Sequence, residues 1–596
     1  MSLAEPKAVY DGFTTLDRGM DSGRPPSNIF SNQVSNAINT SFREDFVSQR
    51  PGWNKIVLTG DDLQQGRWQG AIGYVGANRR PYLIASIGGE IFNVDLFYNT
   101  ITNMSTSTGV SGPYTVPRVW MVQAEQFVVI QNGFSVPLIY DGIVLREAIP
   151  VAFGGIEVPV GRMMEYNNGR LWVTLPDAQS FVGGDLAYSR TGSTADLLGF
   201  TENQFIDGGG AFVMPSNAGK IVAMKTAAIM DTTLGQGPLQ VFGSLGTASI
   251  NAPFDRTQWR NTSSPIGSVS MLAPGPTSQD ATVSINGDLW YRAPDGIRSF
   301  MVARRDHGTW VNTPLSHEVD RVLTYDDPYL MEFASAVDFD NRLLCTVSPY
   351  RATNEGVEYG VAWRGLVALD FKPVSSMFER GQPVWNGAWT GIQILQILKV
   401  DCFGVERCFM FALNADDEIE LWELSRYDLA DNDGATPIQW QIESKALGFP
   451  DRSETLKTLI RTEQWFSGIS GSFSWDVDYR PDGYWGWRVL DSGSVCATTG
   501  LCDGPGCLPP VSNQLQYRPR LITSGPNLDC EECADKPYRN AFEFQFRLTA
   551  VGSATLRRFR CIASDVPENT VGGCLPEQSC CAESGCEDYP WGYNSN

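Results

Sequence analysis

Short runs of apolar residues, separated by turn-forming Gly, Asn and Asp, recur along most of this chain. The runs are rich in Val, Ile, Phe, Tyr and Trp, which favour strands, and no long helical pattern interrupts them. Examples are Tyr82–Asp95, Gln126–Gly142, Ile285–Phe300 and Arg407–Leu424. The pattern predicts a long succession of antiparallel hairpins.

Hairpins that recur every 40–65 residues or so are typical of radial or stacked β-repeats, above all of β-propellers. Seven hairpin-like units can be distinguished, covering residues 67–105, 116–147, 160–195, 218–252, 266–304, 330–372 and 391–428. We therefore predict an all-β fold with a β-propeller-like domain over residues 65–435.

The pattern changes on both sides of this region. In Ala541–Thr549, Phe542, Phe544 and Phe546 alternate with polar residues, as in a strand with one buried face. Residues 436–565 are therefore predicted to form a β-sandwich or platform-like sheet. Residues 1–64 are polar and are predicted to be an N-terminal arm or assembly segment, and residues 566–596 a Cys-rich tail.

Composition supports a soluble, turn-rich β protein of several domains, since 596 residues exceed a single core and the chain holds 59 Gly and 35 Pro. The net charge of −22 argues against DNA binding through phosphate contacts, which requires a basic surface. An acidic surface would nevertheless suit a conduit through which DNA slides without sticking. Solubility alone explains the charge equally well.

Targeting signals are not evident in the sequence. The opening residues Met1–Tyr10 lack the apolar region of a secretory signal, and no run of about 18 apolar residues occurs. We expect a protein that is made in the cytosol and has no membrane span.

Motifs for catalysis are also missing. The two histidines, His307 and His317, have no clear partner, and no GxSxG, HExxH or Walker A pattern occurs. Two acidic groups, Asp338 with Asp340 and the run Asp416–Glu418, would suit a glycosidase pair or a calcium site. Both lie at predicted hairpin turns, where Asp bonds the local backbone. We therefore predict no catalytic residue and no cofactor.

Cysteines are concentrated near the C-terminus, where ten of the 13 lie. These ten are Cys496, Cys502, Cys507, Cys530, Cys533, Cys561, Cys574, Cys580, Cys581 and Cys586. Such clustering indicates disulfides or a metal site. Disulfides formed after release into an oxidising medium are favoured. Zinc at Cys502, Cys507, Cys530 and Cys533 and reduced thiols remain alternatives. Cys345, Cys402 and Cys408 are predicted core residues.

Several short segments together resemble tailed-phage structural proteins of the tail nozzle type, also called tail tubular protein B. The N-terminal pieces are Pro25-Pro26, Asn32-Gln33-Val34, Ala37, Asn39 and Arg50-Pro51-Gly52. The hairpin pieces are Asn168–Val173 with Asp185–Ser189, and Asn286–Trp290 with Asp295–Arg298. The distal pieces are Trp475–Gly483, Tyr517–Arg520 and Phe544–Arg547.

The resemblance implies a non-enzymatic virion protein of the phage tail. It would form a ring, usually of six subunits, below the portal and its adaptor protein, pass double-stranded DNA through its channel without sequence-specific binding, and hold tail fibres. Residues 28–53, with Asn32, Gln33, Val34, Arg50, Pro51 and Gly52, would then be an assembly element, and the tail at 570–596 a distal or fibre-facing decoration. Deleting residues 1–50 should abolish the ring and leave a folded monomer.

Two other functions remain open. One is a different propeller hub in the virion, for fibre or baseplate attachment. The other is a carbohydrate-binding or carbohydrate-hydrolysing propeller, in which Tyr484, Trp485 and Trp487 would stack on sugars. These aromatic residues would equally close a hairpin or pack at an interface.

Overall fold

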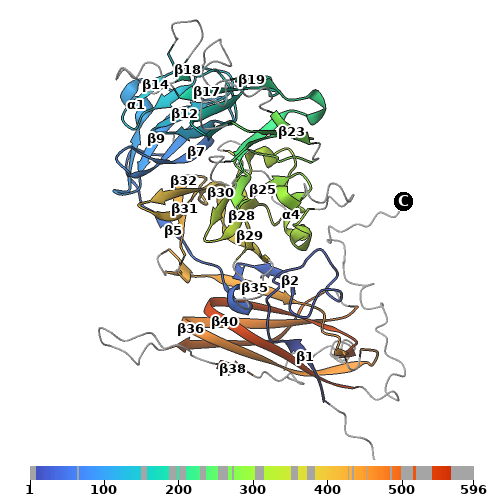
Figure 1. Cartoon of the computed structure of the whole chain (residues 1–596). Helices are drawn as coiled ribbons and strands as arrows, with labels where there is room; N and C mark the ends of the chain where they lie inside the picture. Colours follow the sequence, from blue (N-terminus) through green and yellow to red (C-terminus); the bar gives the residue numbers. More distant parts are fainter. Residues whose placement is uncertain are drawn as a thin grey trace, which may run out of the picture. The chain divides into compact units, whose positions relative to one another are not determined.

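The structure is a computed structural model in which two compact units are formed (Figure 1). The propeller unit comprises residues 50–436, and the sheet unit comprises residues 1–49 together with 437–596. Nearly all regular structure is β-strand, as predicted. The described residues are 8–565 apart from 64–65, 150–156, 187–197, 200–209, 228–236, 253–265, 271–273, 303–313, 351–359, 372–382, 427, 433–434, 451–452, 484–485, 498–514 and 518–539.

Five separate sheets make up the first part of the propeller unit, antiparallel except for the short parallel pair β6–β10 in the first. The first contains β6 (Thr59–Gly60), β7 (Trp68–Val75), β8 (Pro81–Ile87), β9 (Glu90–Asp95) and β10 (Thr100–Asn103). The second contains β11 (Trp120–Ala124), β12 (Phe127–Gln131), β13 (Leu138–Tyr140) and β14 (Leu145–Glu147). The third contains β15 (Met164–Asn167), β16 (Arg170–Thr174), β17 (Ser180–Leu186), β18 (Leu198–Gly199) and β19 (Gly210–Val213). The fourth contains β20 (Ile221–Thr226), β21 (Leu239–Gly243), β22 (Thr247–Ile250) and β23 (Ile266–Ser270), and the fifth β24 (Thr282–Ile285), β25 (Asp288–Ala293) and β26 (Gly296–Ser299).

Two further blade-like units belong to one larger sheet because they share the 19-residue strand β30 (Val384–Cys402). Its first part pairs with β29 (Trp363–Asp370), which follows β28 (Arg342–Val347) and β27 (Ala336–Phe339). From Gln393 onward it pairs with β31 (Val405–Leu413), which pairs with β32 (Ile419–Leu424). Gly391 lies between the two parts at φ 111°, which few other residues adopt. Each of the seven predicted hairpin ranges thus contains paired strands.

The first strands of the seven units form a closed ring. β7 contacts β11, and the contacts continue through β15, β20, β24, β27 and β30 back to β7. This succession of radially arranged sheets is a propeller-like architecture. Short helical turns lie in the connections: α1 (Met104–Thr108), η2 (Ser216–Ala218), η5 (His317–Val319), α4 (Asp320–Leu323) and η6 (Met331–Phe333).

Glutamine side chains bind the inner strands to one another. Neighbouring inner strands share no backbone ladder, so their inward N–H and C=O groups need other partners. The buried amide of Gln396 on β30 accepts the N–H of Ala71 on β7 at 2.8 Å and donates to the C=O of Ala71 at 3.0 Å. One side-chain amide thus replaces the missing strand partner.

The same two-bond arrangement recurs elsewhere in the ring. Gln123 on β11 bonds both backbone groups of Val75 on β7, at 3.1 and 3.0 Å. Gln279, just before β24, bonds both backbone groups of Met224 on β20, each at 2.7 Å. These amide clamps connect sheets that are separate in their backbone pairing.

Ring closure uses a strand from the beginning of the propeller unit. The outermost strand of the last blade is β5 (Trp53–Ile56), which pairs antiparallel with β32. Two short strands, β33 (Ala430–Asp431) and β34 (Thr436–Pro437), follow β32. The first and last blade segments of the unit are therefore hydrogen-bonded in one sheet.

Arg50 fixes this closure. Its side chain is 2% exposed and donates to both carboxylate oxygens of Asp431, at 2.8 and 2.9 Å. The guanidinium carbon lies 3.6 Å from the centre of the Trp53 ring, and the backbone N–H of Trp53 donates to the carboxylate of Asp431. A Cβ at Gly52 would lie 2.0 Å from the carbonyl oxygen of Ala430. The Arg-Pro-Gly turn is thus an intrachain latch, and its role as an assembly contact stays a prediction.

The sheet unit is built from both ends of the chain (Figure 1). Two long strands, β36 (Lys457–Pro481) and β40 (Phe544–Asp565), pair along their lengths. β1 (Ala8–Phe13) and β35 (Gln439–Ser444) pair with β40, and β2 (Val34–Ile38) pairs with β35. The remaining elements are β3 (Thr40–Ser41), η1 (Arg43–Asp45), β4 (Val47–Gln49), β37 (Arg488–Ala497), β38 (Leu515–Tyr517) and β39 (Asn540–Ala541).

The long strands are bent, which gives the sheet unit a core. The rings of Phe546 and Phe559 lie 5.0 Å apart, although 13 residues of a straight strand would span about 43 Å. Register shifts between Ser467 and Ser474 of β36 coincide with the bend. The two halves therefore pack face to face, in the manner of the predicted sandwich.

The segment predicted as a separate arm of residues 1–64 is divided between the units. Residues up to Gln49 supply β1 to β4 of the sheet unit, and residues from Arg50 onward belong to the propeller unit. Deleting residues 1–50 would remove paired strands and the Arg50 latch. Contrary to the expectation of a folded monomer, such a deletion should disrupt the sheet unit itself.

Replacing the clamp residue Gln396 with leucine should lower the free energy of unfolding of the propeller unit by about 2–4 kcal/mol. The substitution leaves the buried N–H and C=O of Ala71 without their side-chain partner. Urea unfolding followed by tryptophan fluorescence measures the loss. Gln393→Leu, at a half-buried position of the same strand, is the control and should change stability by less than about 1 kcal/mol.

Replacing Arg50 with lysine should lower the free energy of unfolding of the propeller unit by about 2–3 kcal/mol. Lysine cannot donate to both carboxylate oxygens of Asp431 at once, as the Arg50 guanidinium does. Lys55→Met breaks the exposed ion pair to Glu420 on the same strand and should cost less than about 1 kcal/mol. Thermal unfolding of both variants tests the latch. An equal loss of stability in the Arg50→Lys and Lys55→Met variants would show that Arg50 contributes no more to stability than a surface charge does.

Candidate functional site

A shallow cavity lies where several inner strands of the propeller unit begin, the usual location of a propeller's central opening. Its lining includes Arg67, Arg118, Asp280, Phe333 and Gln396. Residues from five blade units therefore converge on one place.

Arg118 organises this cavity. Its guanidinium donates to the hydroxyl of Ser278 at 2.9 Å, to the carboxylate of Asp280 at 2.7 Å and to the backbone carbonyl of Glu332. Asp280 is the one carboxylate in the described lining, and Arg118 neutralises it. Hydrolysis of a glycosidic bond needs two carboxyl groups with different protonation states. The arrangement connects blades and lacks the second carboxyl group.

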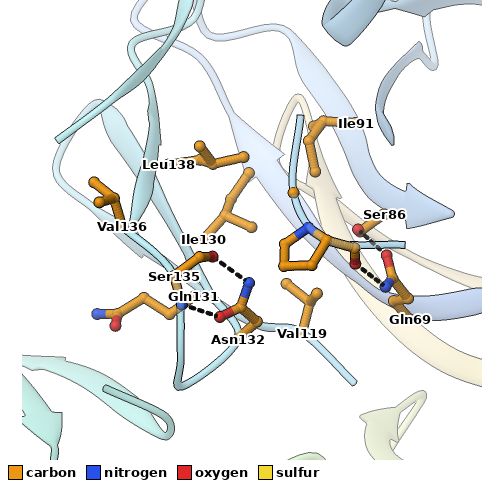
Figure 2. Close-up of a pocket in the computed structure, with 12 residues that line it drawn as sticks. Gln69, Ser86, Ile91, Val119, Ile130, Gln131, Asn132, Ser135, Val136 and Leu138 are labelled. Carbon is orange, nitrogen blue, oxygen red and sulfur yellow. Dashed lines mark hydrogen bonds between the residues drawn. The ribbon is translucent and has the colours of Figure 1, made fainter. Parts of the chain in front are cut away.

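A second cavity, shown in Figure 2, lies between the first two sheets. Its polar groups bond one another or the backbone: Gln69 accepts from Ser86 and Gly89, each at 2.8 Å, and Asn132 donates to Ser135 at 2.5 Å. The rest of the described lining is largely apolar, and none of the labelled residues is titratable. This cavity offers packing and hydrogen bonding but no acid, base or nucleophile.

Buried ion pairs lie away from both cavities. Arg292 donates to Asp326 at 2.7 Å, with side-chain exposures of 2% and 0%, and the N–H of Ser348 donates to the other oxygen of Asp326. Burial raises the pKa of Asp326 to about 6, although Arg292 opposes the shift. Arg342 and Asp370 form a similar pair at 2.9 Å. These pairs connect strands and loops inside the blades.

Asp340 and the Asp416–Glu418 group lie at hairpin turns, as predicted, whereas Asp338 lies within the strand β27. Asp340 has φ 53° between β27 and β28 and bonds Arg342 at 2.9 Å. Its neighbour Asp338 lies 3.7 Å from Lys399, and burial raises the pKa of Asp338. In the second group, the side chain of Asn414 accepts the N–H groups of Asp416 and Glu418, each at 2.9 Å. The turn interpretation therefore explains Asp340 and the Asp416–Glu418 group, while Asp338 is a strand residue paired with Lys399.

Within the described ranges, no group of three or more His, Cys, Asp or Glu residues is placed to hold a metal ion. No helix in those ranges has the length and apolarity to cross a membrane. His317 opens the turn η5, and His307 lies outside the described residues.

Most of the predicted cysteine cluster lies outside the described residues. The zinc candidates Cys502, Cys507, Cys530 and Cys533 do so, as do Cys574, Cys580, Cys581 and Cys586. Cys496 lies in β37, paired in register with Ser472. Cys561 is a buried free thiol whose pKa is raised by burial, so the structure contradicts the disulfide predicted for it. Strand alternation along β40 directs the Cys561 side chain into the apolar core of the sheet unit. Cys345, Cys402 and Cys408 are buried and free, as predicted for core residues.

The other predicted assembly residues also have partners within their own unit. Gln33 is 2% exposed and accepts the N–H of Phe30, and Val34 is fully buried on β2. Asn32 donates to Asp17. As with Arg50, these contacts are intramolecular, because the segment is part of the sheet unit rather than an arm.

The sequence interpretation missed the amide clamps and a row of Arg and aromatic residues on the sheet unit. A signal for the first existed: Gln393 and Gln396 interrupt the apolar run Ile392–Val400, and a polar residue inside a buried strand needs a partner. A signal for the second was Arg557, Arg558 and Arg560 within one predicted strand.

Comparison with known proteins gives no family: no family model and no curated protein matches the chain. A streptogramin B lyase is 9% identical with a TM-score of 0.32, and the match covers 63% of this chain and 97% of the lyase. The Myceliophteria thermophila Cps50 (Swd1) β-propeller domain is 12% identical with a TM-score of 0.32, covering 60% and 100%. A Trypanosoma rangeli sialidase is 9% identical with a TM-score of 0.27, covering 85% and 96%. At these scores the similarities carry no functional argument, and the propeller-like description rests on the ring of strands itself.

The buried carboxyl group of Asp326 should make stability depend on pH. Its pKa is about 6 in the fold and about 3.9 when unfolded, so the fold holds the proton longer. Stability from this group is fully present below about pH 4 and is lost as pH rises through 6. Relative to Asp326→Asn, which stays neutral, the unsubstituted protein should lose about 2–3 kcal/mol between pH 4 and pH 7. Urea midpoints across this range test the sign, and a constant difference would contradict it.

Proposed function

We propose that this protein is a structural component of a phage tail that forms a ring-shaped nozzle for genome passage and fibre attachment. The proposal starts from the resemblance of its short motifs to tail nozzle proteins. In that role it acts with copies of itself, an adaptor protein and tail fibres, and double-stranded DNA passes through without sequence-specific binding.

The observation that carries the proposal is the division into two units. The propeller unit is a closed ring of blades inserted into a sheet unit made from both ends of the chain. Such a chain presents a rigid disc and a separate long-stranded platform. This organisation suits a building block with two attachment regions, one for neighbours in the ring and one for another component.

The chemistry of the interior supports a structural role. Asp326, Asp370 and Asp431 are each held by an arginine at 2.7 to 2.9 Å. These pairs connect loops and strands, and their carboxylates are committed to arginine. The paired interior charges therefore make the fold rigid, which suits a structural component of a conduit.

The acidic surface supports passage of DNA. Acidic residues outnumber basic ones in each unit, and the chain carries a net charge of −22. A bore lined by such a surface repels phosphate and keeps the polymer from binding. The proposal therefore requires acidic loops around the bore.

The sugar-binding alternative loses support at Trp487. The guanidinium carbons of Arg480 and Arg547 lie 4.5 and 4.8 Å from the centre of its ring. These arginines occupy part of the ring surface on which a sugar would stack. Trp485 and Tyr484 lie outside the described residues.

Cryo-electron microscopy of the purified protein and of the particle that contains it tests the proposal. We expect a hollow ring of propeller-bearing subunits in the tail, with acidic loops around a bore wide enough for duplex DNA. A monomer with an open cleft at the propeller centre, and turnover of a surface polysaccharide, would refute it.

A further inference from the structure

One outer face of the sheet unit carries an ordered row of aromatic and arginine side chains. The Arg–aromatic face consists of Tyr10 on β1, Arg558 and Arg560 on β40, and Arg461 and Trp465 on β36. In the strand register Trp465 is opposite Arg558, and Tyr10 is opposite Ile562, two residues beyond Arg560. Figure 1 shows the three strands in the sheet unit.

The aromatic rings and guanidinium groups of this face are stacked on one another. Arg558 lies 4.9 Å from the ring centre of Trp465, and Arg560 lies 5.7 Å from Trp465 and 5.0 Å from Tyr10. Stacking of this kind holds an arginine side chain flat on the sheet. The row therefore has a defined geometry.

A buried glutamate supports the row from below. The side chain of Glu463 is fully buried; its carboxylate accepts from the Nε of Arg560 at 2.9 Å and pairs with Arg461 at 3.1 Å. Arg461 and Arg560 keep 32% and 30% of their side chains exposed, and Tyr10 is 55% exposed. The three arginines thus outweigh the one carboxylate, which leaves a positive face on an acidic chain.

The chemistry of this face selects its ligand. Guanidinium groups already lie over the Trp465 and Tyr10 rings and occupy part of each ring surface, which disfavours stacking of nucleic acid bases there. The guanidinium edges instead suit oxyanions, which they bind with two parallel hydrogen bonds. Arginine, tryptophan and tyrosine together are also the residues that dominate protein–protein interfaces. These two properties indicate the carboxylates of a protein.

The same chain offers a complementary surface on the propeller unit. Asp416, Asp417 and Glu418 form the only run of three consecutive acidic residues in the sequence. All three are exposed at the turn between β31 and β32, where Asn414 fixes the backbone. None of the described ion pairs involves them. The turn is therefore a rigid, unneutralised acidic tip.

We propose that the Arg–aromatic face of one copy binds the acidic turn Asp416–Glu418 of a second copy. The two surfaces differ, so the contact is heterologous, and such contacts generate a closed ring when the rotation between copies closes. The inference rests on the proposed nozzle function, because it identifies the contact that would assemble the ring.

Charge reversal on the full-length protein tests the contact. Arg558→Glu leaves the Glu463 pairs intact, and Asp416→Lys avoids the strained position of Asp417 (φ 61°). Each should raise the protein concentration at half assembly by about tenfold or more, because each places like charges opposite one another. Combining them should restore most of the loss. Mass photometry measures assembly, and thermal unfolding confirms that each variant is folded.

A matched control is available on the same sheet. Arg480 lies over Trp487 as Arg558 lies over Trp465, at 4.5 and 4.9 Å, but is outside the proposed face. Arg480→Glu should change assembly less than about twofold. Raising NaCl from about 0.05 to about 0.5 M should weaken assembly of the unsubstituted protein, because exposed charges are screened.

The outcomes separate this contact from the nozzle function. If the single variants assemble into rings as well as the unsubstituted protein does, the proposed contact is wrong. The same holds if the combined variant assembles as poorly as the single ones. Neither outcome would contradict the nozzle function. Arg558→Glu that preserves assembly but abolishes binding of a labelled DNA duplex would assign the face to nucleic acid and overturn it too. If association depends on salt and the combined variant restores it, the contact is supported. If the protein is at the same time absent from the tail of the particle, the nozzle function is refuted. A protein that stays monomeric at all concentrations would contradict both.

Discussion

The propeller unit depends on how the free edges of its inner strands find hydrogen-bond partners. Radial sheets cannot pair backbone to backbone at the centre, yet a buried N–H or C=O without a partner costs about 1–3 kcal/mol. Gln396, Gln123 and Gln279 solve this by carrying a peptide-like amide on a side chain. The bonds are specific in position, so they fix how each blade sits against the next. Apolar packing alone would leave that register free.

Closure of the same ring determines how the rest of the chain is arranged. The outermost strand of the last blade, β5, comes from the beginning of the propeller unit, and the Arg50–Asp431 latch joins residues 381 positions apart. Once entry and exit of the propeller unit meet in this way, the flanking segments leave from one place. They then co-fold as the sheet unit, which explains why the N-terminal segment is a set of strands and not an arm.

The strand pattern in the sequence was sufficient to predict the fold class and the seven hairpin ranges, because turns and apolar alternation are local. Partners far apart in sequence were not predictable from it. Arg50 was interpreted as an assembly residue because of the resemblance to tail nozzle proteins, and Asp431 becomes its neighbour only through ring closure. Cys561 was grouped with nearby cysteines, whereas strand alternation directs its side chain into the core. Buried glutamines were the one nonlocal contact with a sequence signal.

Net charge is a property of the whole chain, and the structure shows why it is a poor guide to individual surfaces. Several arginines, such as Arg292 and Arg342, are paired with buried carboxylates inside the blades, so they add rigidity and little surface potential. A few, such as Arg558, are held outward on aromatic rings, while carboxylates such as Asp416 are exposed without a partner. An acidic protein therefore still holds a positive face. Because the surrounding surface repels other copies at long range, the self-association that we propose would require a contact that matches this face locally, which would make it specific in geometry.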